Sequence, residues 1–281
     1  MMNTLKTFFL MAGLSVLLVV IGGAFFGEQG AILFFVGSLA LNFGSFWFSD
    51  RIVLKSYRAQ VVTEADAPNL VRTVARLAQR AELPMPRVAI IPNQAPNAFA
   101  TGRGPKSAVV AVTQGLLQML DQDELEGVLA HELGHVKNRD VLLSTIAASM
   151  VGAITLISRL GFYMGGGRNR GGNPIVAIAV MILAPIGAML LQMSVSRSRE
   201  FGADKAGAEI SGKPLALASA LGKLERFAQS RPTDVNPATS HLFIVNPLGG
   251  LGGVSKLFRT HPATGERVTA LTRIAQQMGQ A

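Results

Sequence analysis

The sequence has no cysteine, which limits both its covalent chemistry and its metal chemistry. Among its 281 residues there are 26 Lys and Arg, 17 Asp and Glu and 4 His, but no Cys. The absence of cysteine excludes disulfide bonds and thiolate metal ligands, and it fits a reducing compartment. Any metal ion bound by this chain is therefore held by nitrogen and oxygen atoms.

Charged residues are also scarce. They make up 15% of the chain against 49% hydrophobic residues, which is too apolar for an average soluble protein and indicates a membrane protein. The net charge of +9 does not indicate nucleic-acid binding, because the basic residues flank apolar runs and no DNA-reading motif is present. A G-x-x-x-x-G-K-[ST] loop is absent too, so the chain encodes no ATP-driven step.

Four nearly uncharged runs are long enough to cross the roughly 30 Å hydrocarbon core of a bilayer as helices. They cover residues 7–26, 31–48, 141–158 and 174–193. The spacing within each pair predicts two transmembrane hairpins. A cleaved signal peptide is the alternative for the first run, but this run is longer than a usual signal sequence and no A-x-A site follows it.

The hairpins divide the chain into parts. We expect a transmembrane hairpin at 1–50, a cytoplasmic part with a small sheet at 51–140, a second hairpin at 141–193 and a second cytoplasmic part at 194–281. Both termini then share one side with 51–140. The positive-inside rule assigns that side to the cytoplasm, since Lys6, Arg51, Lys55, Arg58, Lys137, Arg139, Arg197 and Arg199 lie there, against Arg159, Arg168 and Arg170 on the other.

The parts outside the hairpins show helical and strand patterns. Apolar residues at three- and four-residue spacing after Pro68 predict a helix within 66–81. Three short β-prone runs, "PMPRVAIIP", "NAFATG" and "SAVVAVT", predict a small sheet. Further helices are expected at 215–229 and after Pro262. The fold class is thus a mostly α membrane protein with a small β-sheet.

The stretch "LAHELGHVKNRD" carries the clearest chemical motif. His131, Glu132 and His135 match H-E-x-x-H. On a helix, residues i and i+4 share a face, so two imidazoles can bind one cation while the glutamate addresses its water. Zinc is the expected metal. A helix whose histidines are merely solvated near the membrane is the alternative for the pentapeptide alone.

A catalytic zinc ion takes three protein ligands and keeps an open position for water. The candidate third ligand is Glu200 in "SRSREFGADKAGA", and Asp204 lies on the same face to orient a ligating histidine. In isolation such a pair is more often a solvated helix face. The second predicted hairpin changes this expectation. The H-E-x-x-H segment comes directly before the run at 141–158 and Glu200 comes shortly after the run at 174–193, so the hairpin brings both to the same membrane surface.

These residues predict peptide-bond hydrolysis. Zinc would lower the pKa of its water toward about 7, and Glu132 would take the proton and return it to the leaving amine. An oxyanion also needs a hydrogen-bonding or cationic neighbour. His241 and His261 are the candidates from the sequence, and either is equally compatible with an ordinary loop histidine.

With these motifs in place, the whole chain resembles the HtpX family of bacterial membrane-integral zinc metalloproteases, relatives of the eukaryotic CAAX prenyl protease. The resemblance lies in "NAFATG", "HELGHVKNRD", "SRSREFGAD", "LFIVNPL" and "THPATGERV". It implies a gluzincin-like cytoplasmic domain with one Zn²⁺ ion on His131, His135 and Glu200, and Glu132 as base. It further implies an inner-membrane quality-control endopeptidase, with misfolded or damaged membrane proteins as substrates, the lipid bilayer and quality-control proteins as partners, and no nucleic acid.

The resemblance also assigns residues that spacing alone leaves open. Asn97, Ala98 and Phe99 would line the cleft on an edge strand that pairs with the substrate backbone; a plain turn before a strand is the alternative. His261 and Arg267 in "THPATGER" resemble downstream site residues. The sequence "SHLFIVNPL" departs from an expected "HPLFIVNPL", which puts a role for His241 in doubt.

Two other functions compete with proteolysis. A zinc-binding membrane scaffold or regulator would not need Glu132 beside the ligands, whereas hydrolysis does. A metal transporter would carry charged or histidine residues inside its spans, and the four apolar runs lack them apart from Arg159 at one end. The enzyme is the preferred interpretation.

Overall fold

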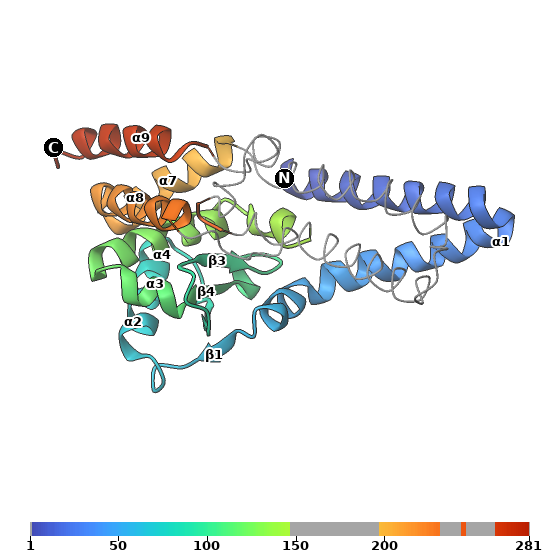
Figure 1. The fold of residues 1–281 in the computed structure, drawn as a ribbon, viewed down its shortest axis with the longest axis horizontal. Helices are drawn as coiled ribbons and strands as arrows, with labels where there is room; N and C mark the ends of the chain where they lie inside the picture. Colours follow the sequence, from blue (N-terminus) through green and yellow to red (C-terminus); the bar gives the residue numbers. More distant parts are fainter. Residues whose placement is uncertain (1, 147–196, 231–242, 246–261, 281) are drawn as a thin grey trace.

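The computed structural model describes residues 2–146, 197–230, 243–245 and 262–280. The run at 174–193, most of the run at 141–158, His241 and His261 lie outside the described residues. Figure 1 shows two parts: a long helical arm formed by α1, and a body of helices and strands at its end.

The arm consists of α1, Met2–Ser56, which is interrupted at Gly27 (φ 64°, ψ −157°). The positive φ suits glycine, because a side chain would be strained there. The chain reverses at this point and the two halves run back alongside each other (Figure 1). Asn42 Nδ2 donates to Ser15 Oγ at 2.7 Å and joins the halves.

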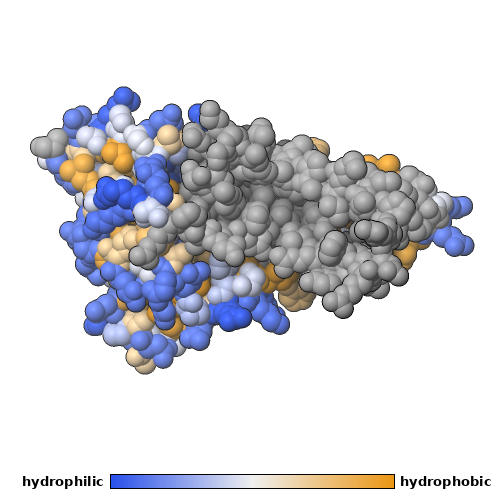
Figure 2. All heavy atoms as spheres, in the orientation of Figure 1, coloured by the Kyte–Doolittle hydropathy of each residue, from blue (hydrophilic) through white to orange (hydrophobic). Residues whose placement is uncertain are grey.

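Within the described residues, Gly27–Phe48 is the helical segment whose length and composition suit a membrane span, with 22 residues and a mean hydropathy of 1.7. Met11–Val20, inside the predicted first span, is a shorter apolar helical segment. Most of the exposed large apolar side chains belong to α1, between Phe8 and Ile52. In Figure 2 grey atoms cover most of the arm, and apolar residues show at its edges. A mostly helical chain with a small sheet and one span-length apolar helix is therefore present, and the other predicted spans remain predictions.

The body contains a four-stranded mixed sheet in the order β1-β2-β4-β3. β2 runs parallel to β4, while β1 and β3 pair antiparallel with β2 and β4. The strands are β1 (Gln60–Val62), β2 (Arg87–Ile91), β3 (Ala98–Thr101) and β4 (Val109–Thr113), with a 3-10 turn η1 (Pro105–Ser107) before β4. β2, β3 and β4 confirm the three β-prone runs, whereas β1 was not predicted.

Helices cover one face of the sheet, and the end of α1 covers the other. Because side chains alternate across a strand, Ala98, Val110 and Val112 face the helical core. Ala111 and Phe99 face the opposite side, where they pack with Val53 and Leu54 of α1. The helices are α2 (Pro68–Arg80), α3 (Gln114–Met119), α4 (Gln122–Lys137), α7 (Arg197–Ser211), α8 (Pro214–Ser230) and α9 (Thr264–Gln277).

The expected helices at 66–81, at 215–229 and after Pro262 are confirmed by α2, α8 and α9. In Figure 1, α4 lies between the sheet and the pair α7 and α8, so the H-E-x-x-H helix is central in the body.

Candidate active site

The helix that carries the motif has strong end signals. Asp121 caps α4 by accepting from Glu124 N–H, and the Glu124 side chain accepts from Asp121 N–H, which forms a capping box. At the other end Arg139 adopts φ 57° and Asp140 N–H donates to the His135 carbonyl at 3.0 Å. This turn brings the Asp140 side chain back toward His135.

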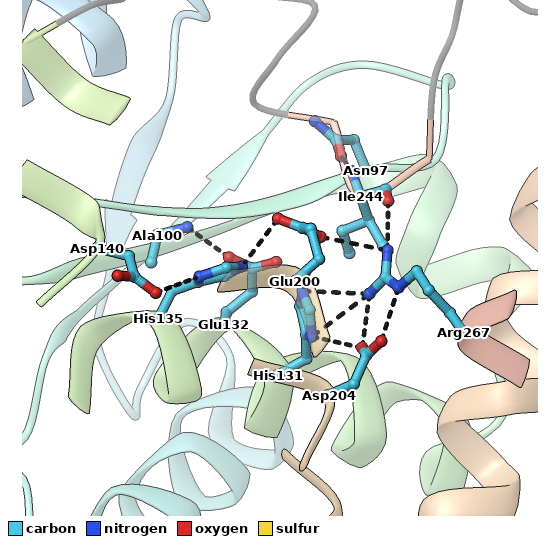
Figure 3. A network of polar contacts seen from close by, with 10 residues as sticks. All are labelled: Asn97, Ala100, His131, Glu132, His135, Asp140, Glu200, Asp204, Ile244 and Arg267. Atoms are coloured by element: carbon cyan, nitrogen blue, oxygen red, sulfur yellow. Dashed lines mark hydrogen bonds and ion pairs between the residues drawn. The ribbon is translucent and has the colours of Figure 1, made fainter. Parts of the chain in front are cut away.

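Glycines allow α7 to approach α4 closely. A Cβ on Gly207 would lie 2.9 Å from His131 Cα and N, and one on Gly134 would lie 3.0 Å from the Ala203 carbonyl oxygen. Only glycine fits at such distances without a backbone shift. The close packing places Glu200 of α7 opposite the two histidines of α4 (Figure 3).

Three side chains converge as a metal-ligand set. One ligand atom from each of His131, His135 and Glu200 lies within 4.8 Å of the other two. His131 Nε2 is 3.9 Å from Glu200 Oε2, and His135 Nε2 is 3.6 Å from Glu200 Oε1. Two nitrogens and one carboxylate form the donor set of a catalytic zinc site with one open position, so these residues fit a zinc ion.

A carboxylate lies behind each histidine. Asp204 Oδ1 is 2.9 Å from His131 Nδ1, and Asp140 Oδ2 is 3.3 Å from His135 Nδ1. Each Nδ1–H can donate to its carboxylate, which fixes the ring and leaves Nε2 directed at the metal position. Asp204 was predicted for this role, and Asp140 was not, although it belongs to the "HELGHVKNRD" motif.

The two histidines have opposite pKa shifts. Burial dominates at His131 and lowers its pKa, against the raising effect of Asp204. At His135 burial also lowers the pKa, but the hydrogen bond with Asp140 and the charge of Glu200 outweigh it and raise the pKa to about 9. A metal ion must displace a proton from such an imidazole, so metal affinity falls as the pH falls.

Glu132 is buried beside the ligand set. Burial, reinforced by the negative charge of Glu200, raises its pKa to about 7, while the charge of His135 opposes the shift. Ala100 N–H on β3 donates to Glu132 Oε2 at 2.8 Å. A carboxyl group with a pKa near the working pH can both accept and return a proton, as a general base must.

Arg267 of α9 is buried, with 1% of its surface exposed. Its Nε and Nη2 donate to Asp204 Oδ2 and Oδ1 at 2.8 and 2.7 Å, and Nη1 donates to the Ile244 carbonyl at 3.0 Å. Although burial favours a raised pKa for Asp204, Arg267 outweighs it and holds that pKa at about 2. Asp204 is therefore a permanent carboxylate behind His131.

The edge strand lies next to these groups. Asn97 immediately precedes β3 and its Oδ1 accepts from Ile244 N–H at 3.3 Å. Ala98 and Ala100 face the helical side, whereas the Phe99 side chain packs on the opposite face of the sheet. His261 lies outside the described residues. The contact of Ala100 with Glu132 was missed, because no pattern in the sequence shows which strand amide meets which helix.

The arrangement of these residues defines a class of protein. Two histidines on one helix, a glutamate from a second helix and a buried glutamate beside them are the residue types of a metallopeptidase centre. The sequence model described as "Peptidase family M48" matches residues 64–275. The chain belongs to peptidase family M48.

Relatives with curated names match over nearly the full length and are each called "Protease HtpX homolog". The relative from Salinibacter ruber is 53% identical over 98% of this chain and 99% of its own length. The relatives from Gemmatimonas aurantiaca and Thermococcus kodakarensis are 54% and 55% identical over 98% of this chain, and over 100% and 97% of their own lengths. The resemblance to the HtpX family is confirmed.

A solved structure shares the fold at low identity. The crystal structure of S. mikatae Ste24p matches with a TM-score of 0.51 and 19% identity over 96% of this chain. The match covers 65% of that longer chain. At this identity the likeness concerns the fold alone.

Proposed function

We propose that this chain is a zinc-dependent, ATP-independent endopeptidase of the bacterial inner membrane that hydrolyses misfolded or damaged membrane proteins. The observation that carries the proposal is the convergence of the His131, His135 and Glu200 ligand atoms within 4.8 Å. Membership of peptidase family M48 supports the same reaction class.

His131, His135 and Glu200 would hold the zinc ion. The chain offers no thiolate, and imidazole with carboxylate suits zinc among the common biological metals. A zinc ion in such a site supplies Lewis acidity, which makes water a stronger acid and polarises a peptide carbonyl. Asp204 and Asp140 orient the two imidazoles from behind.

Glu132 is the proposed general base. It takes the proton of the attacking water and passes it to the nitrogen of the leaving amine. Its raised pKa of about 7 makes the return of the proton favourable near neutral pH. The Ala100 N–H holds one carboxylate oxygen in place.

The outer edge of β3 is the proposed substrate-binding strand. Its inner edge pairs with β4, with Phe99 aligned to Ala111 and Ala100 to Val110. Because Ala100 N–H reaches Glu132 and not β4, the outer edge of β3 faces the catalytic side. A peptide that pairs with this edge binds mainly through its backbone, which suits unfolded substrates of many sequences. Asn97, Ala98 and Phe99 supply this edge.

Arg267 is assigned as a positioning residue. It donates twice to Asp204 and once to the Ile244 carbonyl. Its Nη2 also lies 3.4 Å from His131 Nε2, and its Nη1 lies 3.4 Å from Glu200 Oε2. An arginine held in this way orients the carboxylate behind His131 and keeps the 243–245 segment beside Asn97. Stabilisation of the oxyanion remains the proposed role of His261.

The proposed location is a multi-pass arrangement with the active site and both termini in the cytoplasm. Support comes from the apolar helix Gly27–Phe48 and from the excess of Lys and Arg on the side of the active site. Membrane proteins with damaged or unfolded segments would be the substrates, and other quality-control proteins would be partners.

The test compares purified full-length wild type with Glu132→Gln and Glu200→Gln in detergent. Zinc content and cleavage of an unfolded test protein are measured on the same samples. We expect one zinc ion per chain and cleavage for wild type, zinc without cleavage for Glu132→Gln, and neither for Glu200→Gln. A Glu200→Gln protein that cleaves without zinc would refute the ligand assignment. Bound zinc with no cleavage by wild type would favour a non-hydrolytic scaffold. A scaffold would have no need of Glu132 beside the ligands.

A further inference from the structure

We propose that basic side chains at the end of the α1 arm bind anionic phospholipid headgroups, and that one of them, Arg103, ties the active-site strand β3 to the membrane surface. We call Trp47, Arg51, Lys55, Arg103 and Lys106 the interfacial cluster. The proposal rests on the membrane embedding of α1 described above.

The α1 part of the cluster follows one helix face. Phe43, Trp47, Arg51 and Lys55 recur at intervals of four residues, so they lie one above the other. Trp47 stands at the end of the apolar segment Gly27–Phe48 and is 45% exposed. The face therefore changes from apolar to aromatic to basic, which is the order of a bilayer core, an interface and a headgroup layer.

Arg103 joins this face from a different part of the chain. Its guanidinium carbon lies 4.4 Å from the centre of the Trp47 ring, within the range of a cation–π contact. Arg103 belongs to the loop that follows β3, and not to a membrane helix. The contact thus brings an active-site loop to the predicted interface.

The loop is held in a defined shape. Gly102 has φ 130°, and a Cβ there would lie 2.6 Å from the Ser107 carbonyl oxygen. Arg103 N–H donates to Ser107 Oγ at 3.2 Å, and Ser107 N–H donates to the Gly104 carbonyl at 3.0 Å. Arg103 and Lys106 are therefore presented by a tight turn.

Within the part of the chain that the structure describes, no carboxylate pairs with the basic groups of the cluster. Among the described residues, Arg51, Lys55, Arg103 and Lys106 have no ion pair within 4.0 Å, whereas the nearby Arg87 pairs with Asp50 at 2.9 Å. The sequence has no Asp or Glu between residues 83 and 120. Basic groups beside an interfacial tryptophan match the phosphate charge of anionic lipids, and each strengthens association by roughly fivefold near such a surface.

The cluster is coupled to the catalytic base through β3. Phe99 packs against Tyr57 of α1 with ring centres 5.2 Å apart, and Ala100 N–H donates to Glu132. A headgroup bound at Arg103 would therefore restrain the strand that orients the base and receives the substrate. Loss of the headgroup contact should raise KM for an unfolded substrate more than it lowers kcat.

The single tryptophan makes the test specific. Because Trp47 is the only Trp in the chain, its fluorescence reports on this interface alone. The full-length protein is reconstituted into phosphatidylcholine vesicles that contain the same mole fraction of either brominated phosphatidylglycerol or brominated phosphatidylcholine. We expect at least about twofold stronger quenching by the anionic lipid. This excess of quenching by the anionic lipid over the neutral lipid should shrink at 1 M salt, where the Debye length falls to about 3 Å.

Matched variants locate the site. Arg103→Gln with Lys106→Gln should remove most of the excess and raise KM. Arg72→Gln with Lys205→Gln removes the same charge from exposed positions on other helices and should leave the excess and KM unchanged. Equal quenching by both lipids in wild type, or an unchanged excess in the Arg103 and Lys106 variant, would overturn the proposal. No quenching by either lipid would instead refute the membrane embedding, and zinc content is measured separately.

Discussion

Two buried glutamates on the same helix have opposite properties. Glu126 in the first half of α4 and Glu132 in its second half are 3% and 5% exposed. At Glu126 burial raises the pKa, but hydrogen bonds with Lys213 and Arg76 outweigh it and lower the pKa to about 2. At Glu132 burial prevails and the pKa rises to about 7.

The two carboxyl groups differ in their neighbours and in how deeply the surrounding protein buries them. Glu126 accepts from the Lys213 ammonium at 2.8 Å and forms an ion pair with Arg76, so its negative charge is compensated. Glu132 faces the carboxylate of Glu200, and the charge of His135 and the backbone N–H of Ala100 do not outweigh its burial. One region of α4 therefore uses a carboxylate to join helices, and the other keeps a carboxyl group able to exchange a proton.

The largest expected effect concerns the pH dependence of catalysis. Since Glu132 must be ionised to act as a base, kcat/KM should fall as the pH falls through its pKa. The midpoint should lie between the ordinary 4.5 and about 7, because a bound cation favours the ionised form. Two pH units below the midpoint the loss should reach about 100-fold. Glu126→Gln should show the same profile at a temperature where it is folded, and a flat wild-type profile from pH 4.5 to 7 would contradict the assignment.

The next effect separates the carboxylates behind the histidines. Asp204→Asn and Asp140→Asn should each weaken zinc binding by roughly 10- to 100-fold, because such partners orient the ligating rings. Asp204→Asn should also lower the thermal stability, since it removes the charge that accepts two hydrogen bonds from the buried Arg267 and leaves only the ion pair with Glu200. Competition with a chelating dye measures the affinity. Unchanged affinity in both variants would show that the histidine rings are fixed by packing alone.

The third prediction concerns a substitution that disturbs the packing behind His131 and leaves Glu126 unchanged. Gly207→Ala should destabilise the fold by about 1–3 kcal/mol and weaken zinc binding, because its Cβ would push α7 away from His131. Gly202→Ala on the same helix is the control. A Cβ there would meet no atom closer than Asn138 Nδ2 at 3.7 Å, so alanine should be neutral or stabilising. Equal behaviour of the two variants in calorimetry and zinc titration would argue against the close helix approach.

The sequence predicted the elements better than their contacts. H-E-x-x-H and the i, i+4 spacing of Glu200 and Asp204 identified the metal-ligand candidates because helical periodicity is local. The bond between Ala100 and Glu132, and the turn that returns Asp140 to His135, depend on tertiary packing and a positive φ at Arg139. β1 was missed because three residues, Gln60–Val62, carry too little pattern.

Arg267 shows the same limit. The sequence suggested it as a site residue only through resemblance. Its role depends on contacts of α9 with α4, α7 and Ile244, and no spacing within the chain encodes these contacts. The same holds for Glu126. Nothing in "DQDELEGVLA" predicts that Glu126 forms ion pairs with Lys213 and Arg76, because these two residues come from distant segments.

The smallest expected effect concerns the stability that the ionised Glu126 contributes to the fold. The folded pKa of Glu126, about 2, lies below its ordinary value of 4.5. Its contribution is therefore present above pH 4.5 and is lost as the pH falls toward 2. Because Arg76 and Lys213 are partly exposed, solvent screens the pair, and Glu126→Gln should cost only about 1–2 kcal/mol at pH 7.

The pH dependence of this cost distinguishes charge from shape. Glutamine keeps the size of Glu126, so the stability difference between Glu126→Gln and wild type should shrink as the pH falls from 4.5 toward 2. Glu209→Gln, at an exposed position paired with Lys205, should change stability by less than about 0.5 kcal/mol. Thermal unfolding in detergent at both ends of this pH range provides the measurement. A cost that stays constant with pH would mean that Glu126 joins α2, α4 and the 213 region by its hydrogen-bond geometry, and that the contrast with Glu132 is not one of charge.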